Sequence, residues 1–299
     1  MNLPTGAPAR WIRGAIFVLI CALPVVPAHA APALPASPAL PATRVVTLAP
    51  SLAELVFAVG AGDKLVAVSA FTDFPDAARR LPAVADAAGI AWESLLAAKP
   101  DLVLAWQGGS RPADIARLRE LGVHVIAIGI GNMNDVASAL RLIGNLTGRT
   151  ASAESAAVEF ERQLGALRKS GAGKSVVKTF FQISASPLMT INGAHVISEL
   201  VTLCGGANVF GDARGLVTEP SREELLLRAP DAILYGRSVG EKTGANPDIY
   251  RNLPAARAGR IYGVTADYAY RPGPRLILAA VEICAALDRA RASSEKKNG

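Results

Sequence analysis

A long helical pattern near the middle of the chain constrains the fold more than any other feature. Over residues 150–170, apolar side chains recur at spacings of three and four, charged side chains take the other positions, and Gly171 and Gly173 follow. On both sides of this pattern, short apolar runs alternate with helical segments, which is typical of parallel βα units. We therefore predict an α/β fold with two βα lobes, mainly parallel sheets, one long rigid connecting helix and a ligand cleft between the lobes.

The expected strands are short runs rich in β-branched and apolar residues. Ligands of parallel α/β sheets bind beyond the carboxyl ends of the strands, so the loops that follow these runs are expected to form the site. The expected strands span residues 44–48, 64–69, 101–106 and 124–129 in the first lobe and 176–184, 231–236 and 260–265 in the second; short helices are expected at 53–59 and 92–98, and a terminal helix at 276–290.

The first 30 residues have the features of an export signal. Two arginines precede an uncharged, mostly apolar run at residues 14–26, and residues 28–30 give a small-x-small cleavage pattern. The apolar run is short for a membrane span. Cys21 is not expected to carry a lipid, because Ile20 stands where a lipoprotein signal requires a small residue. We expect a signal peptide at residues 1–30 and a periplasmic location.

The remaining segment boundaries follow changes in composition and pattern. Residues 31–43 are rich in Pro and Ala and are expected to form an extended leader. Beyond the leader we expect an N-terminal α/β lobe at 44–149, the connecting helix at 150–170, a C-terminal α/β lobe at 171–290 and a flexible tail at 291–299.

Composition and charge exclude several classes of protein. With 51% hydrophobic and 19% charged residues among 299, the chain is too apolar for a disordered protein. Loss of the two arginines of the signal peptide lowers the formal net charge from +6 to about +4. The remaining basic residues are scattered along the sequence, so no nucleic-acid partner is expected.

The cysteine count indicates a disulfide bond. Cleavage of the signal peptide leaves Cys204 and Cys284, an even pair in an oxidising compartment. A reactive dithiol is the alternative, but the two residues do not form a C-x-x-C motif.

Catalytic and metal-binding motifs are not found. Residues 171–175 resemble the end of a phosphate-binding loop, but Arg168 stands where that motif requires glycine, and the segment runs from helix to strand. His124 and His195 have no further ligand at metal-binding spacing, and no G-x-S-x-G elbow is present. We expect no catalytic residues, no metal site and no enzymatic activity.

Aromatic residues follow the expected strands in both lobes. Phe71 and Phe74 lie after the second strand, Trp106 ends the third and precedes Gln-Gly-Gly, and Tyr268 and Tyr270 follow the last strand. An aromatic residue taken alone is more often part of a core than of a site. Their shared position at strand carboxyl ends indicates a flat, partly apolar ligand held by ring contacts and a few polar groups.

Six segments together resemble a known family. In their order and spacing they are similar to the periplasmic vitamin B12-binding proteins of ABC importers, within the helical-backbone family of metal-chelate binding proteins. The resemblance covers about residues 44–288 and implies capture of cobalamin and its delivery to an ABC permease at the inner membrane, with no cofactor of its own; we expect a monomer. The segments are residues 44–50, 71–75, 99–109, 204–210, 221–223 and 274–280.

The resemblance also implies roles for individual residues. It implies that two glutamates, one from each lobe, dock onto the permease and that the two cysteines form the disulfide pair of the family. The implied ligand-binding residues are Phe71, Trp106, Asp267, Tyr268, Ala269, Tyr270 and Arg271; the docking residues are Glu93 and Glu223; the disulfide joins Cys204 and Cys284.

The chain departs from the family pattern at several of these positions. Phe71 and Tyr268 stand where the family has Tyr and Trp, and Ala269 and Tyr270 where it has Phe and Glu. Residues 216–218 replace a Pro-Trp-Pro segment, so one stacking tryptophan is missing. The alternative ligand is a haem or a ferric siderophore, with Tyr268 or Tyr270 available as an iron ligand.

Overall fold

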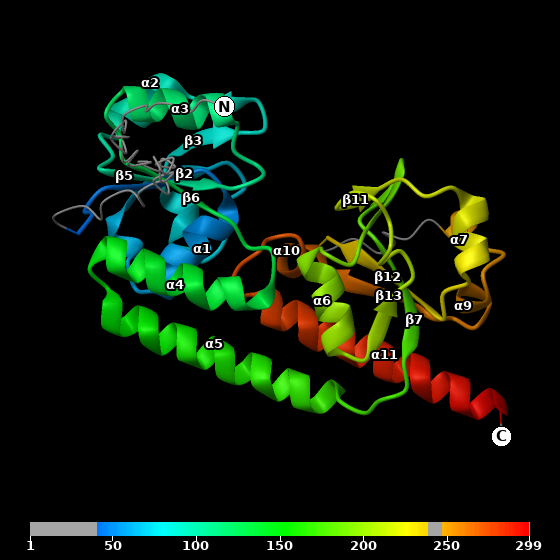
Figure 1. Ribbon diagram of the computed structural model, residues 1–299. Helices are drawn as coiled ribbons and strands as arrows, with labels where there is room; N and C mark the ends of the chain where they lie inside the picture. Colours follow the sequence, from blue (N-terminus) through cyan, green and yellow to red (C-terminus); the bar gives the residue numbers. More distant parts are fainter. Residues whose placement is uncertain (1–40, 239–246, 299) are drawn as a thin grey trace, which may run out of the picture. The chain divides into compact units, whose positions relative to one another are not determined.

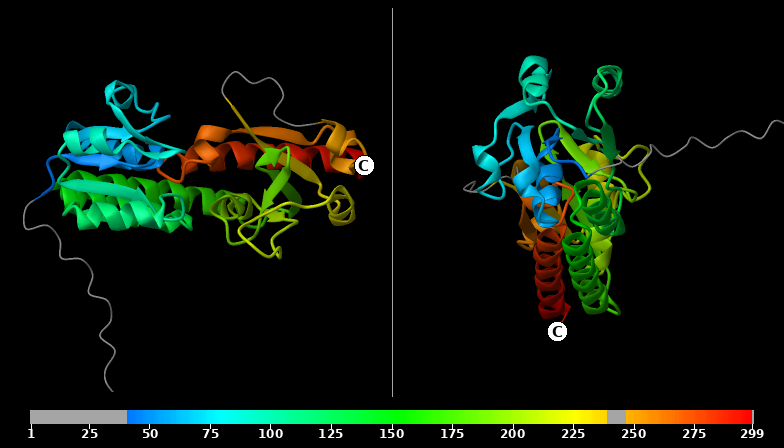
Figure 2. Two further views of the ribbon diagram at one scale, coloured as in Figure 1. Left: turned by 90° about the horizontal axis from the view of Figure 1, so that it is seen from above. Right: turned by 90° about the vertical axis from the view of Figure 1, so that its left-hand side faces the viewer.

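The computed structural model describes residues 41–238 and 247–298 (Figures 1 and 2). The expected signal peptide at 1–30 and the leader up to residue 40 lie outside the described residues. None of the helices in the described part of the chain is long and apolar enough to cross a membrane.

The N-terminal lobe is built on a six-stranded sheet of order β4-β3-β2-β1-β5-β6. All neighbours pair in parallel except β3 and β4. The central strands β1 and β5 carry apolar side chains that are buried on both faces, which explains their continuous hydrophobic sequences. The strands are β1 (Val45–Thr47), β2 (Leu65–Ser69), β3 (Ala83–Asp86), β4 (Gly89–Ile90), β5 (Leu102–Trp106) and β6 (Val125–Ile128).

The C-terminal lobe contains a parallel sheet of order β10-β7-β12-β13 and a smaller antiparallel sheet of order β11-β9-β8. The two lobes with mainly parallel sheets agree with the predicted α/β class. The strands are β7 (Val177–Gln182), β8 (Ser184–Ala185), β9 (Leu188–Ile191), β10 (Gly206–Asn208), β11 (Val217–Thr218), β12 (Ala232–Arg237) and β13 (Ile261–Thr265).

The helices pack around these sheets (Figure 1). They are α1 (Pro50–Ala58), α2 (Trp92–Ala97), α3 (Pro112–Glu120), α4 (Met133–Thr147), α5 (Thr150–Gly171), α6 (Val196–Leu203), α7 (Arg222–Arg228), α8 (Pro247–Tyr250), α9 (Pro254–Arg257), α10 (Ala266–Ala269) and α11 (Leu276–Asn298), with 3-10 turns at η1 (Gly62–Lys64) and η2 (Ala78–Arg80).

Helix α5 connects the lobes, and its position follows from its amphipathic sequence. Ala153, Ala157, Phe160 and Leu164 form its buried stripe, at the spacing read from the sequence. The preceding helix α4 begins at a capping box and ends at a left-handed Gly148, after which the chain turns into α5. Helix α5 therefore runs unbroken from the N-terminal lobe to the first strand of the C-terminal lobe.

Helix α11 packs against α5 and α6 (Figures 1 and 2). The expected disulfide between Cys204, at the end of α6, and Cys284, within α11, is present, with the two Cα atoms 4.7 Å apart. The disulfide predicted from the sequence is therefore confirmed. The disulfide joins α11 to the segment that leads into the edge strand β10.

Two expected boundaries are corrected. Order begins before Arg44, because Ala42 is buried and the backbone N–H of Thr43 donates to Asp101. The terminal helix, expected at 276–290, continues through Asn298 as α11. Arg291 holds the first residue of this extension in place. Its guanidinium pairs with Asp288 and donates to the backbone carbonyls of Ser175, Cys204 and Gly205.

Candidate functional site

A cavity of about 820 Å³ is lined by residues of both lobes. This volume lies in the upper part of the range for small-molecule sites. The carboxyl ends of β5 and β6 contribute from one lobe, and the end of β7, the start of α6, β11 and the end of α10 contribute from the other. The lining residues are Trp106, Gln107, Gly108, Gly129, Ile130, Gly131, Asp135, Ile183, Ala194, His195, Val196, Ile197, Leu216, Val217, Ala269, Tyr270 and Pro272.

Trp106 is held at the edge of this cavity by local contacts. Its backbone N–H donates to Ser110 Oγ at 3.0 Å, which closes the turn after β5. A Cβ at Gly109 would lie 2.2 Å from the indole, so glycine is required there for the ring to keep its position. The tryptophan predicted from the sequence is therefore placed at the cavity by the turn that follows it.

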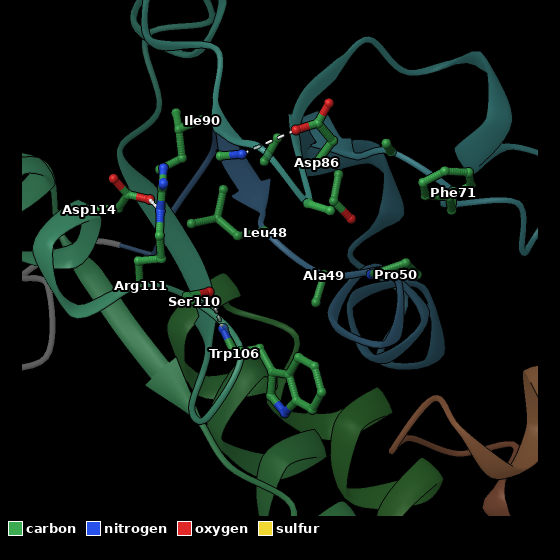
Figure 3. Close-up of a pocket in the computed structure, with 16 residues that line it drawn as sticks. Leu48, Ala49, Pro50, Phe71, Asp86, Ile90, Trp106, Ser110, Arg111 and Asp114 are labelled. Atoms are coloured by element: carbon green, nitrogen blue, oxygen red, sulfur yellow. Dashed lines mark hydrogen bonds and ion pairs between the residues drawn. The ribbon is translucent and has the colours of Figure 1, made fainter. Parts of the chain in front are cut away.

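Trp106 also lines a second hollow of about 290 Å³ in the N-terminal lobe. Figure 3 shows this hollow, with the Arg111 guanidinium facing Asp114 at 2.8 Å and Ser110 beside the Trp106 backbone. Phe71 lines the same hollow but not the larger cavity. The indole thus belongs to two adjoining sites.

Phe71 differs from Trp106 in its surroundings. Its side chain is 80% exposed, and its backbone has a φ of +62°, which a bulky residue rarely adopts. Strained positions of this kind are found where a site requires a particular side-chain direction. The structure leaves the Phe71 ring available to a ligand but does not bring it against Trp106.

Tyr270 and Ala269 contribute to the cavity from the C-terminal lobe. The Tyr270 hydroxyl is 3.3 Å from the carbonyl oxygen of Gln182, and its ring packs edge-on against Phe181. A Cβ at Gly236 would lie 2.1 Å from the hydroxyl, so glycine makes room for this ring. Burial raises the pKa of Tyr270 to about 12, and its hydroxyl therefore stays protonated at neutral pH.

Asp267, Tyr268 and Arg271, predicted as ligand residues, do not line the cavity in the structure. Arg271 instead pairs with Asp73 of the other lobe and with Asp267, whose carboxylate is 3.0 Å away. The hydrogen bond and charge of Arg271 lower the pKa of Asp73. The arginine is therefore used to connect the lobes beside the cavity.

Arg275 forms a second connection between the lobes. Its guanidinium donates to Glu54 with Nε 2.8 Å from Oε2, and the Glu54 side chain is only 2% exposed. It also lies 4.5 Å from the ring centre of Phe74 and 5.3 Å from that of Tyr268. Burial raises the pKa of Glu54, and the hydrogen bond and charge of Arg275 act in the opposite direction. We call Glu54, Asp73, Asp267, Arg271 and Arg275 the inter-lobe ion cluster.

Several cavity residues were not predicted from the sequence. His195 precedes α6 and lines the cavity, although its isolated position in the sequence gave no sign of a site. Gly129, Ile130 and Gly131 were detectable, because Gly129 ends an expected strand and the other two follow it. Leu216 lies at the segment where the family tryptophan is missing, and it lines the cavity with an apolar side chain.

The two predicted docking residues lie outside the cavity. Glu93 is in the first turn of α2 and Glu223 in the first turn of α7, and both are exposed. Each lobe therefore presents one of them on a short helix.

The comparisons with known proteins agree with this architecture. A family model described as periplasmic binding protein matches residues 45–268. A vitamin B12-binding protein of Pectobacterium carotovorum is 35% identical over 246 residues, which cover 82% of this chain and 88% of the relative. A vitamin B12-binding protein of Yersinia pseudotuberculosis is 35% identical over 270 residues, covering 90% of this chain and 91% of the relative.

Solved structures show the same fold. The periplasmic vitamin B12 binding protein BtuF of Vibrio cholerae has a TM-score of 0.78 and 32% identity, covering 84% of this chain and 98% of that one. The periplasmic heme-binding protein RhuT from Roseiflexus sp. has a TM-score of 0.72 and 21% identity, covering 83% and 98%. The second likeness concerns the fold alone.

Proposed function

The chain belongs to the periplasmic binding protein family, and we propose that it captures cobalamin in the cavity between its lobes and delivers it to an ABC permease. The observation that carries this proposal is the 820 Å³ cavity, which has Trp106 on one lobe and Tyr270 on the other. It is supported by 35% identity to proteins named for vitamin B12 binding over most of both chains.

The chemistry of the cavity suits a corrinoid. A corrinoid has apolar faces and peripheral amides, so it matches aromatic and aliphatic walls with a few hydrogen-bonding groups. Its cobalt arrives already coordinated, and it needs no protein ligand to be held. The protein acts as a carrier and not as an enzyme.

The haem alternative requires a different use of the same residues. A tyrosine that binds iron does so as the phenolate. Burial raises the pKa of Tyr270 to about 12, and its hydroxyl is near two backbone carbonyls, those of Gln182 and Ile183. This environment favours the neutral phenol, so we place haem second to a corrinoid. A ferric siderophore carries its own iron ligands and stays an alternative of the same family, which the identity to vitamin B12-binding proteins places second.

Titration calorimetry of the wild-type protein tests the proposal, with cyanocobalamin in one cell and haemin in the other. We expect stoichiometric one-to-one binding of cyanocobalamin. Binding of haemin alone would overturn the proposed ligand while keeping the carrier role, and the absence of binding in both cells would overturn the assignment of the cavity to either ligand.

Glu93 and Glu223 are proposed to dock onto basic residues of the permease. Their exposure at the starts of α2 and α7 makes both carboxylates available to a partner. The combined Glu93→Ala and Glu223→Ala variant should bind cobalamin with unchanged affinity and lose transport in vesicles that contain the permease.

A matched control removes two negative charges at other exposed positions. Glu120 and Glu219 are also exposed, one in each lobe. Their combined replacement by Ala should leave transport intact. Equal transport by the two double variants would contradict the docking assignment.

We also propose that the carrier acts in the periplasm and is a monomer. Light scattering of the purified protein would check the monomeric state.

A further inference from the structure

His195 is a polar residue that lines the cavity between the lobes. It lies immediately before α6, and its side chain caps that helix: Nδ1 accepts the backbone N–H of Ile197 at 3.1 Å. The same side chain lines the 820 Å³ cavity. One ring nitrogen thus has a structural role, while the other is left for the cavity.

The capping bond fixes the protonation of the ring. A nitrogen that accepts a hydrogen bond has its lone pair in use and carries no proton, so the neutral ring has its proton on Nε2. Burial lowers the pKa of His195. A cation would also be disfavoured at the positive end of a helix. Near neutral pH, His195 is therefore a neutral imidazole with an Nε2–H donor.

This donor has no hydrogen-bond partner among the residues that the structure describes. Nε2 of His124 is buried and has no hydrogen-bond partner among the described residues. Nε2 of His195 also makes no hydrogen bond there, but it is not buried. The donor is thus accessible on a residue that lines the cavity. Most of the other lining side chains are apolar or glycine, so an N–H group here can fix the orientation of a ligand.

We propose that His195 donates a hydrogen bond from Nε2–H to an acceptor oxygen or nitrogen of the bound corrinoid. The inference rests on the proposed function. The acceptor is a peripheral amide carbonyl, the nitrogen of an axial cyanide or the oxygen of an axial hydroxide. Because the proton occupies Nε2 and the capping bond occupies Nδ1, the ring has no lone pair for cobalt or iron.

Two substitutions separate the donor from the cap. Asparagine places its carbonyl oxygen at the position of Nδ1 and is among the best capping residues, so His195→Asn keeps the cap and loses the distant donor. Glutamine extends its amide nitrogen to the position of Nε2 and caps poorly, so His195→Gln keeps the donor and loses the cap.

The two variants should give opposite results. In titration calorimetry with cyanocobalamin, His195→Asn should weaken binding by about 2- to 12-fold while its thermal midpoint stays unchanged. His195→Gln should bind within about 2-fold of wild type while its midpoint falls by about 2–4 °C. Unchanged affinity of His195→Asn, or equal weakening by both variants, would overturn the inference.

Methylcobalamin distinguishes the two acceptors, because a methyl group accepts no hydrogen bond. If His195→Asn weakens the binding of cyanocobalamin but not of methylcobalamin, the hydrogen bond is made to the axial ligand. If it weakens the binding of both cobalamins equally, the bond is made to a peripheral amide. A change in the absorption spectrum of aquocobalamin on binding to wild type but not to His195→Asn would show cobalt coordination and overturn the inference. Failure of wild type to bind any cobalamin would overturn the proposed function as well.

Discussion

At the scale of single residues, Trp106 and Phe71 are both expected to contact the ligand, but the structure holds their side chains differently. Trp106 is fixed by the turn to Ser110 and by the space that Gly109 leaves for its ring. Phe71 is 80% exposed on a strained backbone. An aromatic surface that is already positioned loses little entropy when a ligand binds, so Trp106 is expected to contribute more to affinity.

Replacement of Trp106 tests this expectation. Trp106→Ala should weaken cobalamin binding by about 1–3 kcal/mol in titration calorimetry, because a large aromatic contact in the cavity is lost. The matched control is Trp92→Ala, since Trp92 packs in the N-terminal lobe outside both sites. Equal affinities of the Trp106 variant and wild type would remove this residue from the binding site.

Asp73 gives a prediction for the dependence of stability on pH. Its pKa is lowered by Arg271, so folding favours the ionised carboxylate. The stability that Asp73 contributes is therefore present above its unfolded pKa of about 3.9 and is lost as the pH falls through the lower folded value. Asp73→Asn should cost about 0.2–1 kcal/mol at pH 7 and should reduce the loss of stability between pH 5 and pH 3.

Urea unfolding at several pH values measures this effect. Asp76→Asn is the control, because Asp76 lies on the same loop, its side chain is 93% exposed and its ion pair stays within the lobe. Parallel pH profiles for wild type and Asp73→Asn would contradict the prediction.

The stability that Glu54 contributes depends on pH in the opposite direction. Its pKa is raised in the folded protein, so this stability is lost as the pH rises through the folded pKa.

At the scale of secondary-structure elements, the disulfide fixes α11 against the end of α6. Its cysteines are 80 residues apart. A cross-link of this length restricts the unfolded chain, which corresponds to about 4.5 kcal/mol in the chain-entropy account. The combined Cys204→Ala and Cys284→Ala variant should lose up to that free energy of unfolding, as measured by urea denaturation.

The disulfide lies away from the cavity, so binding provides the control. Neither cysteine is among the residues that line the cavity. The folded double variant should therefore keep its affinity for cobalamin. A large loss of affinity at a temperature where the variant is fully folded would show that the position of α11 influences the site, contrary to this expectation.

At the scale of the whole molecule, the lobes are connected by α5 and by the inter-lobe ion cluster. Breaking a buried ion pair leaves an unpaired charge, at a cost of about 3–5 kcal/mol. Arg275→Met should have this effect, because Glu54 would retain only Arg271, with the nearest atoms 3.8 Å apart. The combined Glu54→Leu and Arg275→Met variant should be more stable than Arg275→Met alone, since no charge is stranded.

An exposed ion pair provides the comparison for urea unfolding. Arg162 and Glu159 lie on the surface of α5, with side chains 66% and 50% exposed, and Arg162→Met should cost less than about 1 kcal/mol. If Arg275→Met were as mild as Arg162→Met, the ion cluster would not stabilise the contact between the lobes.

The sequence by itself determined the class of fold, seven of the thirteen strands in the described part of the chain, the connecting helix and the disulfide. The strands and the connecting helix depend on local periodicity, which is read over short stretches of chain, and the disulfide follows from a count of the cysteines in the whole chain. Helix α4 was not predicted, although Asn132 and Asp135 form its capping box and Gly148 ends it. The signals for this helix were present in the sequence.

Only the tertiary structure decided which side chains meet in the cavity. Ala269 and Tyr270 line it, whereas Arg271, the next residue, pairs with Asp73, which is 198 positions away. His195 enters the cavity because α6 begins there. Contacts of this kind depend on how distant segments pack against one another, and no local pattern records that packing.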